Sequence, residues 1–296
     1  MSATPRISIG MPAYNGAATI GSSIEALLAQ TFGDFELIVS DNSSTDSTRD
    51  VVEALVRQDT RVRYVRQPTN IGANMNYTYV ATVARGEYLK WASASDWCAP
   101  TFLDRCLGAL ERDSDAVLAV PRTRLFEGEP SKARDYARDI AILDDRPFDR
   151  LKRLITTISL NNAINGLIRL PALRRTRLIE PYHTADMVLM GHLAMLGKFV
   201  LVDEPLFFRR MEPATATALQ DADAVRRHHY PQLSARTLLQ NWKRQAGWFR
   251  AVAAAPMPLG ERARALSHMA RRCYWDRAIL LDDLRGVWRY ATQGAG

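Results

Sequence analysis

The first 120 residues alternate short apolar runs with segments of helical periodicity, and this alternation restricts the fold more than any other feature. The apolar runs read as buried strands, and the segments between them place apolar residues at helical spacing. The runs are 7–11, 35–40, 62–66, 88–92 and 116–120, and the helical segments are 18–30, 43–58, 73–84 and 100–112. Repeated β-α units of this length predict an α/β fold with a largely parallel sheet and right-handed crossovers.

Polar residues follow three of these predicted strands. Tyr14 comes just after the first run, Asp41 after the second, and the segment 93–96 after the fourth. In open parallel sheets, ligands bind outside the carboxyl ends of the strands. The sequence therefore predicts a single cleft that gathers residues from distant parts of the chain.

Several short motifs stand in a fixed order along the chain. They are Pro12-Ala13-Tyr14-Asn15, Ser40-Asp41-Asn42-Ser43-Ser44-Thr45-Asp46, Asn70-Ile71-Gly72 with Asn76, Ser93-Ala94-Ser95-Asp96, and Asp186 at the start of an apolar helix. Their order and spacing over residues 5–214 resemble the family 2 glycosyltransferases. The resemblance implies the GT-A fold, which is a Rossmann-like, mostly parallel sheet flanked by helices, and inverting transfer from a nucleoside-diphosphate sugar.

The resemblance assigns the first two motifs to the nucleotide of the donor. Pro12, Tyr14 and Asn15 would line the base pocket, where the Tyr14 ring offers a stacking surface. Asp41 would accept a hydrogen bond from a base N–H, as its counterpart in the family does for uracil, which favours a UDP-type donor. On the residues alone, the segment 41–44 is equally typical of a turn followed by a helix N-cap.

The third motif matches a family segment whose backbone and amide groups line the donor pocket. It comprises Asn70, Gly72 and Asn76. Gly72 lies near a predicted helix start, where the missing Cβ permits a close approach of the backbone. A plain loop-to-helix turn explains the same residues.

The fourth motif departs from the family pattern where the diphosphate should lie. Ser95 replaces the usual metal-binding aspartate and Asp96 remains, while Glu212 replaces a histidine that often faces the diphosphate. Divalent cations prefer carboxylate oxygens, so Asp96 and Glu212 could together hold Mn²⁺ or Mg²⁺. Alternatively the cation is weakly held or absent, and Arg209 or Arg210 neutralises the leaving group. Ser95, Asp96 and Arg210 are expected beside the donor in either case.

Asp186 stands where the family carries the catalytic base. An inverting transferase needs one carboxylate that takes the proton of the acceptor hydroxyl. An acid favoured by the helix dipole is the alternative on spacing alone. Asn165 and Gly166 precede the acceptor side of the family's cleft, so the resemblance places them against the acceptor.

The last part of the chain has a different character. Residues 215–296 hold 13 Lys and Arg against 6 Asp and Glu, which accounts for the whole net charge of +7, and four of the 6 tryptophans. We therefore expect a GT-A domain over 1–214 and a basic, Trp-containing helical extension over 215–296. Trp and Arg on helices suit an anionic membrane surface, and a helical cap with inward Trp side chains is the alternative. Nucleic-acid binding is not expected, because no recognised module is present.

The sequence also indicates the cellular location of the protein and the classes of function that it can have. No signal peptide or membrane-spanning segment is expected, and 3 scattered cysteines suit reduced thiols. We expect a cytoplasmic protein, located at the inner face of the plasma membrane if the extension binds lipid. The sequence is compatible with a monomer and with a homo-oligomer. The leading hypothesis is an inverting glycosyltransferase acting on a carbohydrate or lipid-linked acceptor. The alternatives are a non-catalytic GT-A protein that binds nucleotide or glycan, and, third, a sugar nucleotidylyltransferase.

Overall fold

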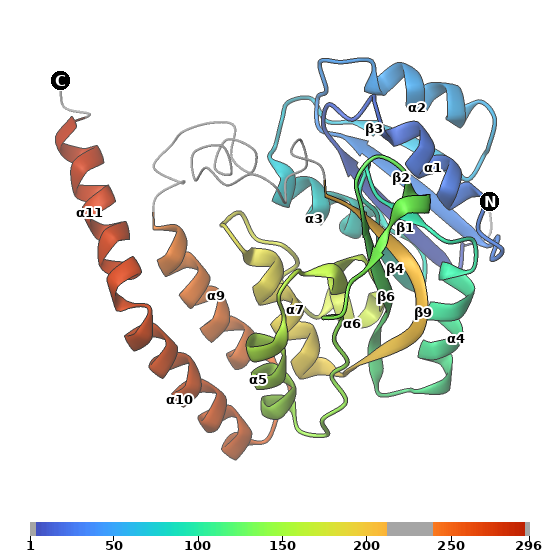
Figure 1. Cartoon of the computed structure of the whole chain (residues 1–296). Helices are drawn as coiled ribbons and strands as arrows, with labels where there is room; N and C mark the ends of the chain where they lie inside the picture. Colours follow the sequence, from blue (N-terminus) through green and yellow to red (C-terminus); the bar gives the residue numbers. More distant parts are fainter. Residues whose placement is uncertain (1–3, 212–238, 294–296) are drawn as a thin grey trace.

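The computed structural model describes residues 4–211 and 239–293, and its centre is a nine-stranded mixed sheet (Figure 1). The strands are β1 (Ile7–Ala13), β2 (Phe35–Asp41), β3 (Val62–Arg66), β4 (Tyr88–Trp91), β5 (Trp97–Cys98), β6 (Ala116–Phe126), β7 (Arg134–Asp135), β8 (Leu167–Arg169) and β9 (Lys198–Arg210). Their order is β3-β2-β1-β4-β8-β6-β9-β5, and β7 pairs with β6.

Helices cover both faces of this sheet and extend to one side of it. The helices are α1 (Ile20–Leu28), α2 (Thr48–Val56), α3 (Ala73–Val83), α4 (Phe102–Arg112), α5 (Pro147–Thr157), α6 (Leu170–Arg174), α7 (Ala185–Leu196), α9 (Gln240–Ala254), α10 (Leu259–Trp275) and α11 (Arg277–Gln293), with short 3-10 turns η1 (Pro130–Lys132) and η2 (Asn162–Asn165).

The N-terminal half of the sheet confirms the predicted β-α alternation. β2 and β4 both pair with β1 in parallel, and β3 pairs with β2 in parallel. The register sets Ala13 of β1 opposite Asp41 of β2. Because parallel strands end at the same edge, the segments after β1, β2 and β4 meet there, as the sequence predicts.

The C-terminal half differs from the expected parallel arrangement. β8 lies between β4 and β6 and is antiparallel to both, so the sheet is mixed. Residues Lys198–Arg210 form a single strand, β9, which pairs with β6 in parallel. The register between β6 and β9 shifts where Arg122 faces Pro205. Proline lacks the ladder N–H, so an irregularity at this position lets the strand continue beyond it.

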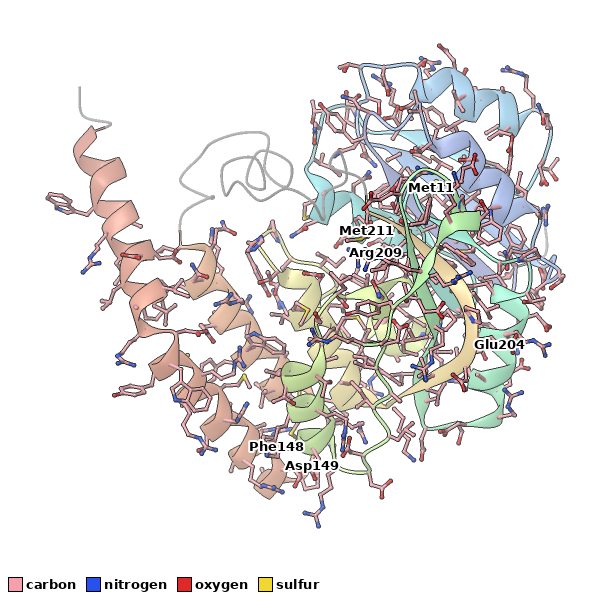
Figure 2. All side chains as sticks on the ribbon, in the orientation of Figure 1. Met11, Phe148, Asp149, Glu204, Arg209 and Met211 are labelled. Atoms are coloured by element: carbon pink, nitrogen blue, oxygen red, sulfur yellow. The ribbon has the colours of Figure 1, made fainter. Side chains whose placement is uncertain are left out.

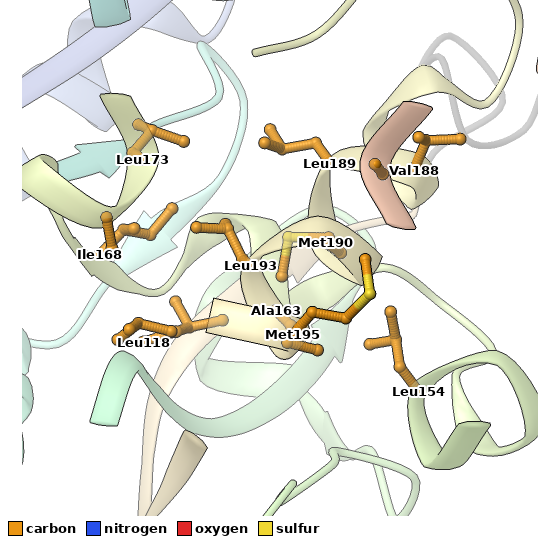
Figure 3. Close-up of a cluster of buried hydrophobic side chains, with 14 of the residues drawn as sticks. Leu118, Leu154, Ala163, Ile168, Leu173, Val188, Leu189, Met190, Leu193 and Met195 are labelled. Carbon is orange, nitrogen blue, oxygen red and sulfur yellow. The ribbon is translucent and has the colours of Figure 1, made fainter. Parts of the chain in front are cut away.

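Alternating side chains of the strands build a hydrophobic cluster on each face. Leu37 and Val39 face a cluster that includes side chains of α1, α2 and α4, whereas Ile38 faces the cluster of α3, α6 and α7. Figure 3 shows part of the second cluster, where Leu189, Met190 and Leu193 of α7 lie among side chains of neighbouring elements. Packing in this second cluster holds α7 in place, and Asp186 lies in the first turn of that helix.

The C-terminal helices join the second cluster. Trp248 of α9 is 4% exposed and its ring lies so close to α7 that a Cβ at Gly191 would come within 2.2 Å of it. Ala265 and Met269 of α10 belong to the same cluster, and Figure 1 shows α9 between α7 and α11. The predicted domain boundary at 214/215 lies outside the described residues. Within residues 4–211 and 239–293, no helix has the length and hydropathy that crossing a membrane requires.

Candidate functional site

The segment after β1 forms one wall of the site at the carboxyl edge of the sheet. Pro12 lies in β1 opposite Ser40 of β2. Tyr14 follows β1 and is 45% exposed, so its ring has an open surface. Asn15 adopts a φ of 50°, a left-handed conformation that asparagine tolerates better than most residues. This sharp turn directs the chain away from the sheet towards α1.

Asn15 ties this wall to the segment after β2. Its backbone N–H donates to Ser44 Oγ at 2.9 Å, and its Oδ1 accepts from the Thr45 backbone N–H at 2.8 Å. The predicted donor-binding role of Asn15 stays a prediction, and its observed contacts fix the two loops relative to each other.

Asp41, the predicted base-binding residue, is fully buried at the end of β2. Its Oδ1 accepts from the Ser44 backbone N–H at 2.8 Å, which is the turn chemistry expected as an alternative. Its Oδ2 accepts from the Tyr64 hydroxyl at 2.5 Å and from Arg66 at 3.0 Å. A nucleobase would therefore share this carboxylate with protein donors.

The third motif is held together by amide pairs. Asn42 Nδ2 donates to Asn70 Oδ1 at 2.7 Å, and the Gly72 backbone N–H donates to the same oxygen at 2.9 Å. Gly72 has a φ of 83°, which a residue with a side chain would adopt with strain. Asn76 is buried and its side chain bonds Ser40 through both amide atoms. These contacts anchor α3 to β2, and direct donor contacts by Asn70, Gly72 and Asn76 stay predictions.

The degenerate acidic motif lies between β4 and β5. The Ser93 and Ser95 hydroxyls bond each other at 3.0 Å. Asp96 Oδ1 accepts from the Arg210 backbone N–H at 2.9 Å, and Arg210 Nε donates to the Ser95 carbonyl at 3.0 Å. Burial raises the pKa of the Asp96 carboxyl, and the Arg210 N–H and the Arg209 charge oppose that rise. A hollow of about 390 Å³ opens beside this loop and is lined in part by Asp96 and Arg210.

These residues fit a resident divalent cation poorly. Among the described residues, no group of three or more His, Cys, Asp and Glu side chains is placed to hold a metal ion. Asp96 supplies one carboxylate, and serine hydroxyls are weak ligands beside it. The other predicted ligand, Glu212, lies outside the described residues.

Asp186 lies in the first turn of α7, and its side chain is half-buried. Its Oδ2 accepts from Asn161 Nδ2 at 2.8 Å. Thr184, just before the helix, has a φ of 59°, so the chain turns sharply into α7. One carboxylate oxygen is thus oriented by an amide, while the side chain keeps access to solvent.

The two predicted halves of the reaction centre come together around Tyr77 of α3. Burial raises the pKa of Tyr77 to about 12, the negative charges of Asp96 and Asp186 act in the same direction, and Arg209 opposes them. Asn161 bonds Asp186 and the adjacent Asn162 bonds Arg209, while the backbone N–H of Arg210 donates to Asp96, so a chain of contacts connects the three groups. Figure 2 shows Arg209 at the carboxyl-terminal part of β9.

The predicted acceptor residues are buried beneath this site. Gly166 ends η2, and a Cβ there would lie 2.4 Å from the Ala119 carbonyl oxygen of β6. The absence of a side chain at Gly166 therefore allows close packing on the sheet, and Asn165 is buried beside it. An acceptor contact by Asn165 or Gly166 stays a prediction.

Sequence reasoning missed Asn161 and Asn162, which precede these residues. Asn161 holds Asp186, and Asn162 Oδ1 accepts from Arg209 at 2.6 Å. The only signal in the sequence is the run Asn161-Asn162-Ala163-Ile164-Asn165, which is unusually rich in amides for a segment before a strand.

Comparison with protein families identifies the motif-bearing region. Residues 8–179 match the model described as "Glycosyl transferase family 2". The matched region includes every predicted nucleotide-binding residue up to Asp96 and stops before Asp186.

Among curated proteins, similar sequences are glycosyltransferases of bacteria. Glycosyltransferase GlyG of Streptococcus pneumoniae serotype 4 is 30% identical over 113 residues, which are 38% of this chain and 38% of that protein. A Campylobacter jejuni protein named GalNAc(5)-diNAcBac-PP-undecaprenol beta-1,3-glucosyltransferase is 32% identical over 93 residues, 31% of this chain and 30% of that protein. The matched segments span about two fifths or less of the first relatives' own length.

Among solved structures, residues 1–349 of TarS from S. aureus have a similar fold. The TM-score is 0.59 at 17% identity, and the alignment covers 98% of this chain and 92% of that one. The same protein solved in complex with UDP-GlcNAc gives a TM-score of 0.59 at 14% identity, with coverage of 98% and 92%. At this level of sequence identity, the structural similarity establishes the fold alone.

Proposed function

Since this chain belongs to glycosyl transferase family 2, we propose that it is a glycosyltransferase that moves a sugar from a nucleoside-diphosphate sugar to a hydroxyl acceptor with inversion. The observation that carries the proposal is a chain of contacts: Asn161 bonds Asp186, the adjacent Asn162 bonds Arg209, and the backbone N–H of the next residue, Arg210, donates to Asp96. The sheet edge and the start of α7 thereby bring a carboxylate beside basic groups that suit an anionic leaving group.

We expect the donor to be a UDP-sugar. The exposed Tyr14 ring provides a stacking surface for a planar base. The buried Asp41 carboxylate is proposed to accept a base N–H in place of one of its protein donors. The structural neighbour TarS has been solved with UDP and with UDP-GlcNAc. These observations support a uridine nucleotide more than a particular sugar.

Asp186 is the proposed general base. Its carboxylate takes the proton of the acceptor hydroxyl while that oxygen forms a bond to the anomeric carbon. The bond from that carbon to the diphosphate oxygen breaks, and the nucleoside diphosphate leaves with the electron pair. Attack from the face opposite to the leaving group inverts the anomeric configuration.

Charge on the leaving diphosphate is the second requirement of the reaction. Arg209 and Arg210 lie close to Asp96, and we propose that they neutralise the charge of the leaving diphosphate. A cation, if it binds, would use Asp96 and be held more weakly than by a complete acidic motif. We therefore assign neutralisation to the arginines and no step to a metal ion.

The acceptor is proposed to be a carbohydrate or a lipid-linked glycan, which places the protein in polysaccharide or glycolipid synthesis. The name of the Campylobacter relative refers to an undecaprenol-linked glycan. Another relative, from Pasteurella multocida, is 31% identical over 109 residues, which are 37% of this chain and 11% of that protein, and is named hyaluronan synthase. Both names describe those proteins, and they support an acceptor class for this one.

The C-terminal helices are proposed to dock the enzyme on an anionic membrane surface. Trp248 is buried, as the alternative of a helical cap predicts, but Trp275 is 61% and Trp288 69% exposed. On α11, Leu281 and Leu284 are also exposed, at 51% and 46%, and with Trp288 they recur at i, i+3 and i+7 on one stripe.

Charge on these helices favours lipid over a neutral partner. The acids Asp276 and Asp283 bond to residues of α9, namely Gln245 and Asn241. Arg277 and Arg285 lie on the same helix as the stripe, and Arg285 pairs with one exposed acid, Asp282, at 2.9 Å. The arginines are proposed to attract anionic headgroups while Trp rings settle at the interface. Docking of this kind would place the enzyme at a cytoplasmic membrane face.

A binding and turnover experiment with the whole protein tests the proposed function. Calorimetry with UDP, CDP, GDP and ADP should show the tightest binding for UDP. UDP release from a panel of UDP-sugars should then identify at least one substrate, and nuclear magnetic resonance of the product should show an inverted anomeric centre. Tight UDP binding without release from any sugar would instead favour the non-catalytic alternative, and no nucleotide binding would refute both.

A further inference from the structure

Two neighbouring asparagines contact the two halves of the proposed reaction centre. Asn161 Nδ2 donates to Asp186 at 2.8 Å, and Asn162 Oδ1 accepts from Arg209 at 2.6 Å. Asp186 is the proposed base, and Arg209 faces the proposed leaving group. One short turn of the backbone therefore connects the groups that act on opposite sides of the anomeric carbon.

The amide of Asn162 is oriented by a buried network. Its Nδ2 lies 3.4 Å from Asp139 Oδ1, and Asp139 itself accepts from the backbone N–H and the hydroxyl of Thr123 at 2.6 and 2.7 Å. Since Nδ2 is directed towards a carboxylate, the Asn162 carbonyl oxygen must face the other way, towards Arg209. Both Asn162 and Thr123 are almost fully buried, so this orientation is rigid.

The amide of Asn161 has one unused group. Its Nδ2 donates to Asp186, while its Oδ1 is buried and has no hydrogen-bond partner among the described residues. A buried carbonyl oxygen without a partner destabilises the fold unless a donor reaches it. A donor that reaches this oxygen lies beside the Asp186 carboxylate, because the same amide group bonds Asp186, and the acceptor substrate binds there if the proposed function is correct.

The geometry points to an acceptor site at Asn161, which takes a carbohydrate that carries two adjacent hydroxyls. One hydroxyl gives its proton to Asp186 and attacks the donor, and the neighbouring hydroxyl donates a hydrogen bond to Asn161 Oδ1. Asn162 is a positioning residue that holds Arg209 for the diphosphate. This inference rests on the proposed function and moves the acceptor site from Asn165 and Gly166 to Asn161.

Simple alcohols test the acceptor half without knowledge of the natural acceptor. We would measure transfer from a UDP-sugar substrate to propane-1,2-diol, which has adjacent hydroxyls, and to 1-propanol, which has one. The wild-type protein should prefer the diol by about tenfold, the usual effect of one hydrogen bond. Asn161→Ala should lose this preference, and Ser159→Ala, an exposed neighbour on the same loop, should keep it. A preference that survives in Asn161→Ala would overturn the site.

A double-mutant cycle tests whether Asn161 acts through Asp186. Hydrolysis of the UDP-sugar by water should fall about a hundredfold in Asn161→Ala, because the base is misplaced, while UDP affinity stays within twofold. In the Asp186→Asn background the same change should have almost no further effect. Additive losses would mean that Asn161 supports the fold alone. This cycle decides the question even if neither alcohol is a substrate.

UDP binding tests the other half and separates this inference from the proposed function. Asn162→Ala should weaken UDP affinity by about tenfold, because Arg209 loses its anchor, while Asn161→Ala leaves it unchanged. A wild-type protein that binds UDP but turns over no donor would refute the proposed function, and the Asn162 result would still stand. Unchanged UDP affinity in Asn162→Ala would refute the role of Asn162.

Discussion

At the scale of single residues, Asp41 has an observed role in the fold and a proposed role in base binding, and a substitution can separate them. Its carboxylate accepts from Ser44, Tyr64 and Arg66, so Asp41→Ala should lower the free energy of unfolding by about 1–3 kcal/mol. If Asp41 also contacts a base N–H, UDP affinity falls by a similar amount while affinity for inorganic diphosphate does not change. Urea denaturation and calorimetry measure both effects. Equal weakening of UDP and diphosphate binding would show that Asp41 acts through the fold.

Ser95 decides how strongly the enzyme depends on metal. Wild-type activity should fall modestly in chelator, because the arginines beside Asp96 neutralise the leaving group. Ser95→Asp adds a second carboxylate at the loop and should lower the manganese concentration for half-maximal activity by about tenfold. Titration of metal into chelator-treated protein measures this shift. A wild-type enzyme that loses all activity in chelator and recovers it at micromolar manganese would show that Asp96 suffices.

Residues that bind and residues that pack were hard to separate in the sequence. Tyr14 lies after a strand and is exposed, as the pattern predicts. In the sequence, Gly166 and Asn76 resemble residues that contact a ligand. In the structure, Gly166 packs against a strand carbonyl and Asn76 bonds Ser40. The roles of Asn161 and Asn162 depend on contacts with α7 and β9, which no local pattern encodes.

At the scale of elements, periodicity predicted the N-terminal half of the sheet well because β1, β2 and β4 are buried along their whole length and the strands alternate with helices. The C-terminal half depends on long-range pairing. The insertion of β8 between β4 and β6 has no local signal, and Pro205 reads as a strand break although β9 continues through it with a shift of register.

The contact between α9 and α7 is the element-scale feature most open to a test. Trp248 fills the space above Gly191, so Trp248→Ala should lower the free energy of unfolding by about 3–5 kcal/mol. Trp275→Ala is the matched control, because that ring is 61% exposed and its loss should cost little. Urea denaturation compares the two variants. Similar small costs would mean that α9 is not part of the core.

At the scale of the whole molecule, the shared core limits how membrane docking is tested. Removing the C-terminal helices would expose α7, so point substitutions on α11 are the sharper choice. The double substitution of Leu281→Glu and Leu284→Glu should abolish co-sedimentation with anionic phospholipid vesicles, because acids replace apolar side chains on the exposed stripe of α11. Leu143→Glu, on a loop where the side chain is 55% exposed, is the matched control.

Binding to vesicles should also depend on charge. The wild-type protein should pellet with anionic vesicles more than with neutral ones, and less as the salt concentration rises, since screening weakens headgroup attraction. Equal recovery of the wild-type protein and the double variant would contradict docking through α11. A salt-independent loss of self-association in the double variant would assign the stripe to a second copy of the chain.

The most direct test of the central claim is the rate of UDP release by Asp186→Asn, compared with wild type under the same conditions. The account predicts that release falls by about 10²–10⁴-fold, the usual contribution of a general base, while calorimetry gives nearly unchanged UDP affinity. A variant that keeps more than about a tenth of the wild-type rate would contradict the assignment of Asp186 as the base.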